Sequence, residues 1–185
     1  MSEQDQRHVV VRRADRPGDL GWVVMAHGEV YSKQFGWNTD FEALVAKIVA
    51  EYAARHDPDR EAGWIAEVDG RRVGCVFLMA GDRPRTARLR ILLVTPQGRG
   101  LRLGARLVGE CLAFAREAGY EQVTLWTNDV LVAARKIYRS FGFTLADEER
   151  HHSFGHDLVG QNWTLDLHAT ERVLPGTIGE RRRGT

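Results

Sequence analysis

The sequence is short of cysteine and has almost no net charge. Its two cysteines, Cys75 and Cys111, show neither C-x-x-C spacing nor the density of a small disulfide-rich scaffold, so we expect reduced thiols in the core. Lys and Arg number 26 against 25 Asp and Glu, which gives a formal net charge of +1. No strong overall field therefore attracts nucleic acid or a membrane surface, and we expect neither as a partner.

Long apolar runs are also absent. Residues 1–7 are polar and lack the apolar stretch of a secretory signal, and no later run approaches the ~20 apolar residues of a membrane span. These absences favour a cytoplasmic location. What is present is the composition of an ordinary globular domain, with 43% hydrophobic and 28% charged residues. A chain of 185 residues is long enough for one domain with a substantial core.

Hydrophobic periodicity and turn residues predict a series of strands and helices. Asp19 follows Pro17 and Gly18 and can act as the N-cap of the first helix. Asp69-Gly70 is a typical tight turn between two strands. The predicted elements are a strand at 9–11, helices at 20–36 and 39–56, strands at 64–68, 73–80 and 87–94, a helix at 103–118, a strand at 123–126, a helix at 133–141, and strands at 143–148 and 163–167.

This order, β-α-α-β-β-β-α-β-α-β-β, indicates a single α/β domain of the α+β kind over residues 1–168. The last residues, 169–185, contain Pro175, Gly176, Gly179 and three consecutive arginines and have little to bury. We expect them to form a mobile C-terminal tail.

A glycine-rich turn joins a predicted strand to the most regular predicted helix. Gly98, Gly100 and Gly104 expose backbone N–H groups at a helix N-terminus, which is a natural phosphate site, and Arg99 and Arg102 add side-chain charge. The Gly-Lys-Ser/Thr of a phosphate-binding P-loop is absent, and the dinucleotide pattern G-x-G-x-x-G fails by one residue. A glycine-rich turn without a ligand is the alternative.

This loop resembles the pyrophosphate loop of the GNAT superfamily of N-acyltransferases, whose pattern is Arg/Gln-x-x-Gly-x-Gly/Ala. Arg99 stands at its first position and Gly104 at its last, whereas Arg102 replaces the inner glycine. Arg102 either points outward or crowds the pyrophosphate, and its position can demand a changed backbone angle.

A second segment strengthens the resemblance. Ala134, Tyr138 and Gly142-Phe143 match the family pattern Asn-x-x-Ala-x-x-x-Tyr-x-x-x-Gly-Phe, although Asn128 lies three residues earlier than that pattern requires. The chain also resembles the acetyltransferase modules that are often joined to MarR-type winged-helix regulators. No winged helix fits within the chain, so the catalytic module alone is expected. The segments similar to those modules are His27-Gly28-Glu29-Val30-Tyr31, Gly36-Trp37, Leu125-Trp126-Thr127-Asn128-Asp129 and His152-Ser153-Phe154-Gly155.

The resemblance implies a single GNAT-like domain, in which four helices flank a mixed, mostly antiparallel sheet of about seven strands. It also implies transfer of an acetyl group from acetyl-CoA to a primary amine of a small molecule or peptide by direct attack, without a metal. A homodimer is compatible with it. The alternative is a non-catalytic acyl-CoA-binding sensor or regulatory module, which Arg102 and the lack of an evident base keep open. A nucleotide-binding regulator fits neither the failed fingerprints nor the neutral charge.

Acyl transfer needs a neutral amine, stabilisation of the carbonyl oxyanion and a proton for the departing thiolate. By resemblance Tyr138 supplies that proton, and the backbone amide of Val94 binds the oxyanion. Tyr138 could instead be a helix aromatic that packs on the sheet. Glu29 is the leading candidate for the general base, ahead of Asp129 and His152, although a lone glutamate is more often a solvated helix residue.

The other expected site residues follow from the same resemblance. His151, His152 and His156 look like loop residues, because no acidic or cysteine partner lies at metal-ligand spacing. The residues expected on the acceptor side are Glu29, Tyr31, Trp37 and Trp126. Those expected to bind acetyl-CoA are Leu93, Val94, Arg99, Gly100, Leu101, Arg102, Leu103, Gly104, Ala105, Asn128, Ala134 and Tyr138.

Overall fold

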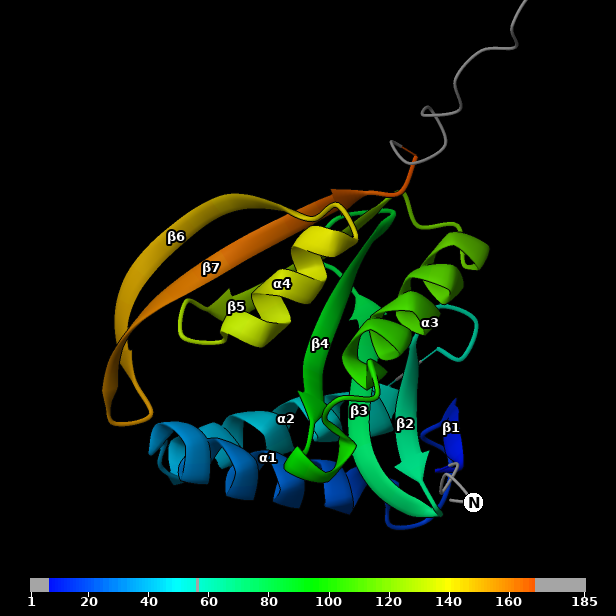
Figure 1. Ribbon diagram of the computed structural model, residues 1–185. Helices are drawn as coiled ribbons and strands as arrows, with labels where there is room; N and C mark the ends of the chain where they lie inside the picture. Colours follow the sequence, from blue (N-terminus) through cyan, green and yellow to red (C-terminus); the bar gives the residue numbers. More distant parts are fainter. Residues whose placement is uncertain (1–6, 56, 169–185) are drawn as a thin grey trace, which may run out of the picture.

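The structure, a computed structural model, describes residues 7–55 and 57–168, so the tail predicted at 169–185 lies outside the described residues. Within them, seven strands form one sheet in the order β1-β2-β3-β4-β5-β7-β6, in which β4 and β5 alone pair in parallel (Figure 1). The predicted element order and the mostly antiparallel sheet with four helices are confirmed. The elements are β1 (Val9–Arg13), α1 (Asp19–Phe35), α2 (Thr39–Arg55), β2 (Ala62–Val68), β3 (Arg71–Ala80), β4 (Thr86–Val94), a short 3₁₀ turn η1 (Pro96–Gly98), α3 (Leu103–Glu117), β5 (Gln122–Asn128), α4 (Val132–Ser140), β6 (Thr144–Ser153) and β7 (His156–Asp166).

Helices cover both faces of the sheet. In Figure 1, α3 and α4 lie against the side that faces the reader, and α1 and α2 run along the lower side. Neighbouring residues of β3 point to opposite faces of the sheet and therefore pack in two separate hydrophobic cores. Phe77 packs with Val23 and Val45 of the first helix pair, whereas Val76 packs with Leu107 of α3. The sheet therefore separates an α1–α2 side from an α3–α4 side.

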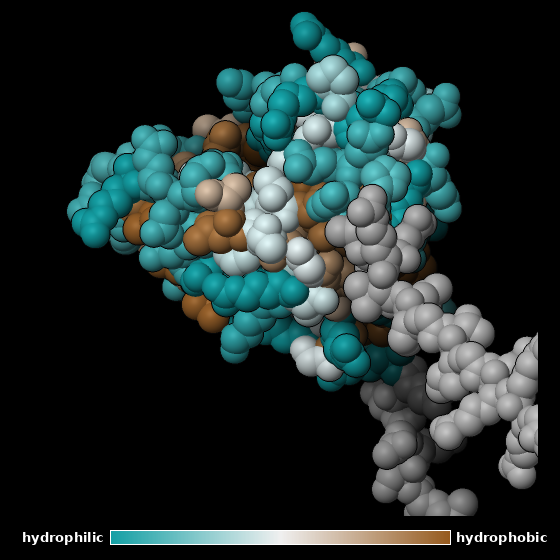
Figure 2. Space-filling view, turned by 90° about the horizontal axis from the view of Figure 1, so that it is seen from above, coloured by the Kyte–Doolittle hydropathy of each residue, from teal (hydrophilic) through white to brown (hydrophobic). Residues whose placement is uncertain are grey.

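The burial of the cysteines and the polarity of the surface are those of a folded domain with an apolar core. Cys75 and Cys111 are free and buried, as expected for reduced core thiols. Seen from above, hydrophilic residues cover most of the molecule and hydrophobic ones show in smaller areas between them (Figure 2). None of the helices within residues 7–55 and 57–168 is long and apolar enough to cross a membrane.

The last two strands are much longer than predicted. β6 and β7 form a hairpin of ten and eleven residues, where the sequence indicated strands only at 143–148 and 163–167. β6 is an edge strand that is exposed along most of its length, so its residues lack the apolar alternation on which the prediction depends. Phe154 and Gly155 both adopt positive φ at the turn, as in a type I′ hairpin.

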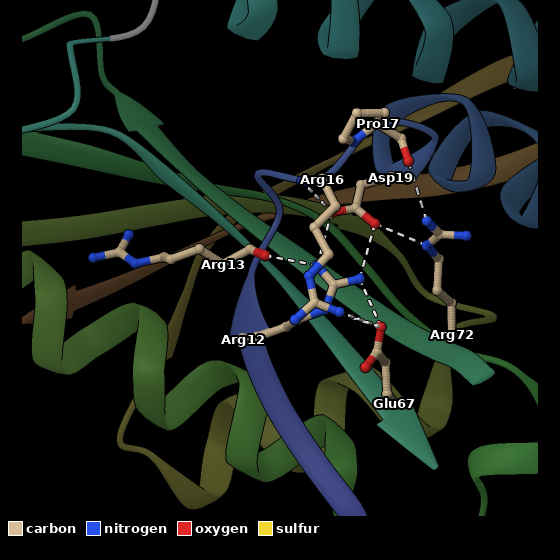
Figure 3. A network of polar contacts seen from close by, with 7 residues as sticks. All are labelled: Arg12, Arg13, Arg16, Pro17, Asp19, Glu67 and Arg72. Atoms are coloured by element: carbon tan, nitrogen blue, oxygen red, sulfur yellow. Dashed lines mark hydrogen bonds and ion pairs between the residues drawn. The ribbon is translucent and has the colours of Figure 1, made fainter. Parts of the chain in front are cut away.

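A buried ion network fixes the start of α1 to the sheet (Figure 3). Gly18 occupies the N-cap, so the N-cap role predicted for Asp19 is wrong by one residue. Asp19 is fully buried and accepts hydrogen bonds from Arg12 of β1 and Arg72 of β3, each at 2.8 Å, and from the backbone N–H of Arg16 at 2.9 Å. Burial alone would raise the pKa of Asp19, but these hydrogen bonds hold it well below its usual range.

Replacing Asp19 with Asn should lower the free energy of unfolding by ~3–5 kcal/mol at neutral pH, because it leaves two arginines without their shared buried anion. A carboxylate with a depressed pKa stabilises the fold above its unfolded pKa of about 3.9 and ceases to do so as the pH falls towards the folded value. Urea unfolding at several pH values should therefore show the gap between wild type and Asp19→Asn narrowing below about pH 4.

Glu121→Gln is the matched control, because Glu121 pairs with Arg85 at the surface, where both side chains are exposed. Its cost should stay below about 1 kcal/mol. Equal costs for the two variants would show that the network around Asp19 does not stabilise the fold.

Candidate active site

The parallel pairing of β4 and β5 covers only the first part of β4. It ends at Leu89 opposite Leu125, although β4 continues to Val94. Beyond Leu89, Ile91 adopts a left-handed φ of 48°, and the register with β3 shifts beside it. A bulge of this kind bends a strand and increases its twist. The two strands therefore diverge from the middle of β4 onward (Figure 1).

Two adjoining cavities lie where the strands diverge. The first, of about 490 Å³, extends from α1 and α2 on one side of the sheet to Tyr138 of α4 on the other. The second, of about 340 Å³, follows the end of β4 to Arg99 and Gly104. They form one path, because they share the lining residues Tyr31, Leu92, Leu131 and Ala134.

The end of β4 offers free backbone groups to this path. The N–H of Thr95 donates to the carbonyl of Val73 in β3 at 2.8 Å. Successive backbone amides along a strand point to opposite sides. The N–H of Val94 therefore points away from β3, towards the side on which β5 has diverged, and Val94 lines the second cavity.

The glycine-rich loop forms the far end of the second cavity. Arg102 is the N-cap of α3 and adopts a left-handed conformation, with φ 55° and ψ 25°, which is the changed backbone angle that its position can demand. Its side chain is exposed. A Cβ at Gly104 would lie 2.6 Å from Cδ1 of Ile137, so the end of that side chain would have to shift. Gly104 lines the second cavity, so the first turn of α3 borders it.

Tyr138 lies on the wall of the first cavity. It is 5% exposed, and its ring packs 5.8 Å from that of Phe143. Burial raises the pKa of its hydroxyl far above the usual value, so the phenol carries its proton at neutral pH. None of the described residues hydrogen bonds with this hydroxyl. Tyr138 therefore both packs against the sheet and presents an unpaired O–H donor next to the cavity.

Asn128, at the end of β5, lies on the same wall and is held by the long hairpin. Nε2 of His151 lies 2.9 Å from Oδ1 of Asn128, and Nδ1 of His151 lies 2.8 Å from the hydroxyl of Ser153. Because the amide oxygen of Asn128 can only accept, Nε2 of His151 donates to it. The loop predicted at His151, His152 and His156 is wrong, because these residues lie in β6 and β7. Asn128 and His151 lie 23 residues apart, which gives no local signal of their contact.

His27 was not among the residues predicted for the site, yet it lines the first cavity from α1. Its Nδ1 lies 2.7 Å from the carbonyl oxygen of Val23, and its ring stacks on Tyr31 at 5.8 Å. Its Nε2 has no hydrogen-bond partner among the described residues. Burial lowers the pKa of His27 to about 4, against the opposing effects of Val23 and the Ile91 backbone. His27 is therefore neutral at pH 7.

The candidate bases lie apart from Tyr138. Glu29 is exposed on α1 and lines a third cavity, of about 370 Å³, beside Arg72 and Gln97. Asp129 accepts a hydrogen bond from the backbone of Val159, and His152 pairs with an exposed aspartate. None of the three lines the first cavity. Within the described residues, no group of three or more histidine, cysteine or acidic side chains could hold a metal ion.

Of the predicted site residues other than the candidate bases, some line one or both cavities and five line neither. Leu103 is in the core, and Gly100, Leu101, Arg102 and Ala105 lie in the loop or the first turn of α3 outside both cavity linings. The residues that line the first cavity are Tyr31, Trp37, Trp126, Asn128, Ala134 and Tyr138. Those that line the second are Tyr31, Leu93, Val94, Arg99, Gly104 and Ala134.

Comparison with known proteins agrees with this fold. The acetyltransferase (GNAT) family matches residues 22–143. An uncharacterised N-acetyltransferase of Schizosaccharomyces pombe is 30% identical over 122 residues, 65% of this chain and 74% of that protein. The mycothiol acetyltransferase of Sanguibacter keddieii is 33% identical over 141 residues, 72% of this chain but only 43% of that protein.

Among solved structures, that of yncA from Salmonella typhimurium, determined with its cofactor acetyl-CoA, has a TM-score of 0.70 at 20% identity and covers 92% of this chain and 99% of its own. At that identity the likeness concerns the fold. The sequence matches define the class of protein, which is an N-acetyltransferase. The chain belongs to the GNAT family of N-acetyltransferases.

Replacing Gly104 with Asp should weaken CoA binding about 10- to 100-fold, because it places a carboxylate at the helix N-terminus where the phosphates are expected. Gly104→Ala is the matched control, since it adds the Cβ near Ile137 without the charge. Calorimetric titration with CoA measures both. An unchanged dissociation constant in the aspartate variant would exclude this loop as the pyrophosphate site.

Arg102→Gly should leave the fold intact and keep or tighten CoA binding. A left-handed conformation costs an ordinary residue roughly 1–2 kcal/mol, which the change to glycine would remove. Glycine also gives the unfolded chain more conformational freedom, which lowers stability by about 0.5–1 kcal/mol. The free energy of unfolding should therefore change by less than about 1.5 kcal/mol. A large loss of CoA affinity would show instead that Arg102 is itself a phosphate ligand.

Proposed function

We propose that this chain transfers an acetyl group from acetyl-CoA to a primary amine by direct attack of the amine on the thioester. The observation that supports this most is the path of two cavities through the sheet. It runs from the first turn of α3, past the unpaired edge of β4, to a buried and protonated Tyr138. A thioester bound along it would meet an acceptor from the α1–α2 side.

The cofactor would occupy the second cavity. Arg99 and the backbone amides around Gly104 would bind the pyrophosphate, as anions bind at helix N-termini. The pantetheine arm would pair with the free edge of β4, which places the thioester carbonyl near the N–H of Val94. Asn128 and Ala134 would complete the wall on the side of β5 and α4.

The reaction would then need several proton movements. The neutral amine attacks the carbonyl carbon, its nitrogen loses a proton to water, the C–S bond breaks, and the departing thiolate takes the proton of the Tyr138 hydroxyl, which water then restores. Because Glu29, Asp129 and His152 lie outside the cavity, the ammonium form of the acceptor would lose its proton to water rather than to one of these side chains. The aromatic side chains of Tyr31, Trp37 and Trp126 would face the acceptor.

A second function stays open. The absence of an acidic side chain from the cavity wall and the unusual residue at Arg102 favour a non-catalytic acyl-CoA-binding module as the alternative. CoA release in the presence of acetyl-CoA and a broad panel of amines, together with calorimetric binding of acetyl-CoA, distinguishes the two. Binding without turnover on any amine would favour the sensor. The cytoplasmic location, the homodimer and the link to MarR-type regulators stay predictions.

Tyr138→Phe should lower kcat about 10²- to 10⁴-fold while the dissociation constant of acetyl-CoA changes little, because the variant keeps the ring and removes the proton donor. Single-turnover acetyl transfer at several pH values measures the chemical step separately from product release.

Tyr120→Phe is the matched control for this substitution. Tyr120 is equally buried, but its hydroxyl donates to the carbonyl of Arg60 at 3.0 Å and lies outside both cavities. It should lose about 1 kcal/mol of stability and no turnover. Wild-type rates in Tyr138→Phe would reduce Tyr138 to a packing residue.

A further inference from the structure

One end of the first cavity is positively charged. Arg88 and Arg90 lie two residues apart on β4 and therefore point to the same face. Arg90 is opposite Phe77 of β3 in the sheet, and Phe77 packs under α1 and α2, so this face is the α1–α2 side. Both arginines line the cavity, and among the described residues no aspartate or glutamate does.

The charge of Arg90 has no close partner. Arg88 forms an ion pair with Asp82, which is 82% exposed. Arg90 is partly buried and makes no hydrogen bond or ion pair with any of the residues that the structure describes. Burial lowers the pKa of Arg90 and the charge of Arg88 lowers it further, whereas Glu51 and Asp82 act in the opposite direction without contact. A guanidinium held out of water in this way favours an anion beside it.

The rest of the α1–α2 side of the cavity is apolar. Aromatic rings from α1, α2 and the loop between them form much of the wall, and Val45 and Ile48 of α2 add aliphatic surface. The rings belong to Tyr31, Trp37 and Phe41, whose centroids lie 4.6 to 5.2 Å from one another. A ligand that fits here has an apolar body and one anionic end.

We propose that the acceptor is a small primary amine that also carries a carboxylate, which Arg88 and Arg90 bind while the amine faces Tyr138. This inference rests on the proposed function, since it names the class of acceptor for the same site. The position on β4 separates this pair from the pyrophosphate loop. Arg90 and Val94 lie opposite Phe77 and Gly74 of β3, which are three residues or about 10 Å of extended strand apart, so the phosphates of the cofactor are expected at the other end of the path.

The test compares matched acceptors. Each of the common L-amino acids, and β-alanine and 4-aminobutanoate, is assayed with acetyl-CoA beside its carboxamide and its decarboxylated amine. For the best acceptor, kcat/KM should be about 10- to 100-fold higher with the carboxylate than with either neutral analogue. A neutral analogue that is equal or better in every set overturns the inference but leaves the proposed function standing. No turnover with any amine overturns the proposed function itself.

Substitutions at single arginines test whether Arg90 causes the preference for a carboxylate. Arg90→Gln should remove most of the preference for the carboxylate through KM and leave the dissociation constant of acetyl-CoA unchanged. Arg90→Lys keeps the charge without the planar fork and should retain part of the preference. Arg83→Gln removes an equal charge from an exposed arginine outside the cavity and should keep all of it. Equal loss in Arg83→Gln and Arg90→Gln would show a general effect of net charge and contradict a carboxylate site.

Discussion

The divergence of β4 from β5 is the constraint on which the rest of the site depends. A parallel pair that stayed together would close the sheet between α1–α2 and α3–α4. Here the left-handed Ile91 bends β4 after Leu89, and the edge that β5 would have satisfied is left open near Val94. A β-branched residue at positive φ is strained, and such strain gathers at functional sites. The opening lets a ligand on one face of the sheet meet a ligand on the other.

Different elements surround the opening on the two faces of the sheet. In the proposed function, the loop before α3 and the wall of α4 bind the cofactor, and the aromatic rings of α1 and α2 face the acceptor. The β6–β7 hairpin curves towards the ends of these helices (Figure 1), where the N–H of Asn38 donates to the carbonyl of Phe154 and His156 contacts the carbonyl of Gly36. Trp37 packs on Phe154 there. The ion network at Asp19 anchors the other end of α1 (Figure 3).

The features that could be predicted from the sequence are those that depend on local residue patterns. Helical spacing, turn residues and the glycine loop placed the elements, and two short motifs pointed to Gly104 and Tyr138, which the structure brings to one path. Glu29 shows the limit of such reasoning. The helix was predicted correctly, but which face each residue occupies depends on how the helix packs, and α1 turns His27 towards the cavity and Glu29 away from it.

Contacts between distant segments could not be predicted either, because they too depend on how the elements pack. The pairing of Asn128 with His151 requires a hairpin whose exposed edge strand lacks any apolar alternation. The strand bearing Arg88 and Arg90 was predicted from its apolar positions, but the cavity beside these arginines exists only because β5 diverges and α2 lies across that face. The bulge at Ile91 could not be predicted either, because no glycine or proline stands at that point of the sequence.

A crystal structure of the chain with acetyl-CoA would show directly whether the cofactor enters between β4 and β5. We predict the pyrophosphate at the first turn of α3, the pantetheine arm along the open edge of β4, and the thioester carbon within the cavity that Tyr138 lines. Acetyl-CoA bound elsewhere on the molecule, or β4 and β5 closed together with the cofactor outside them, would contradict this prediction.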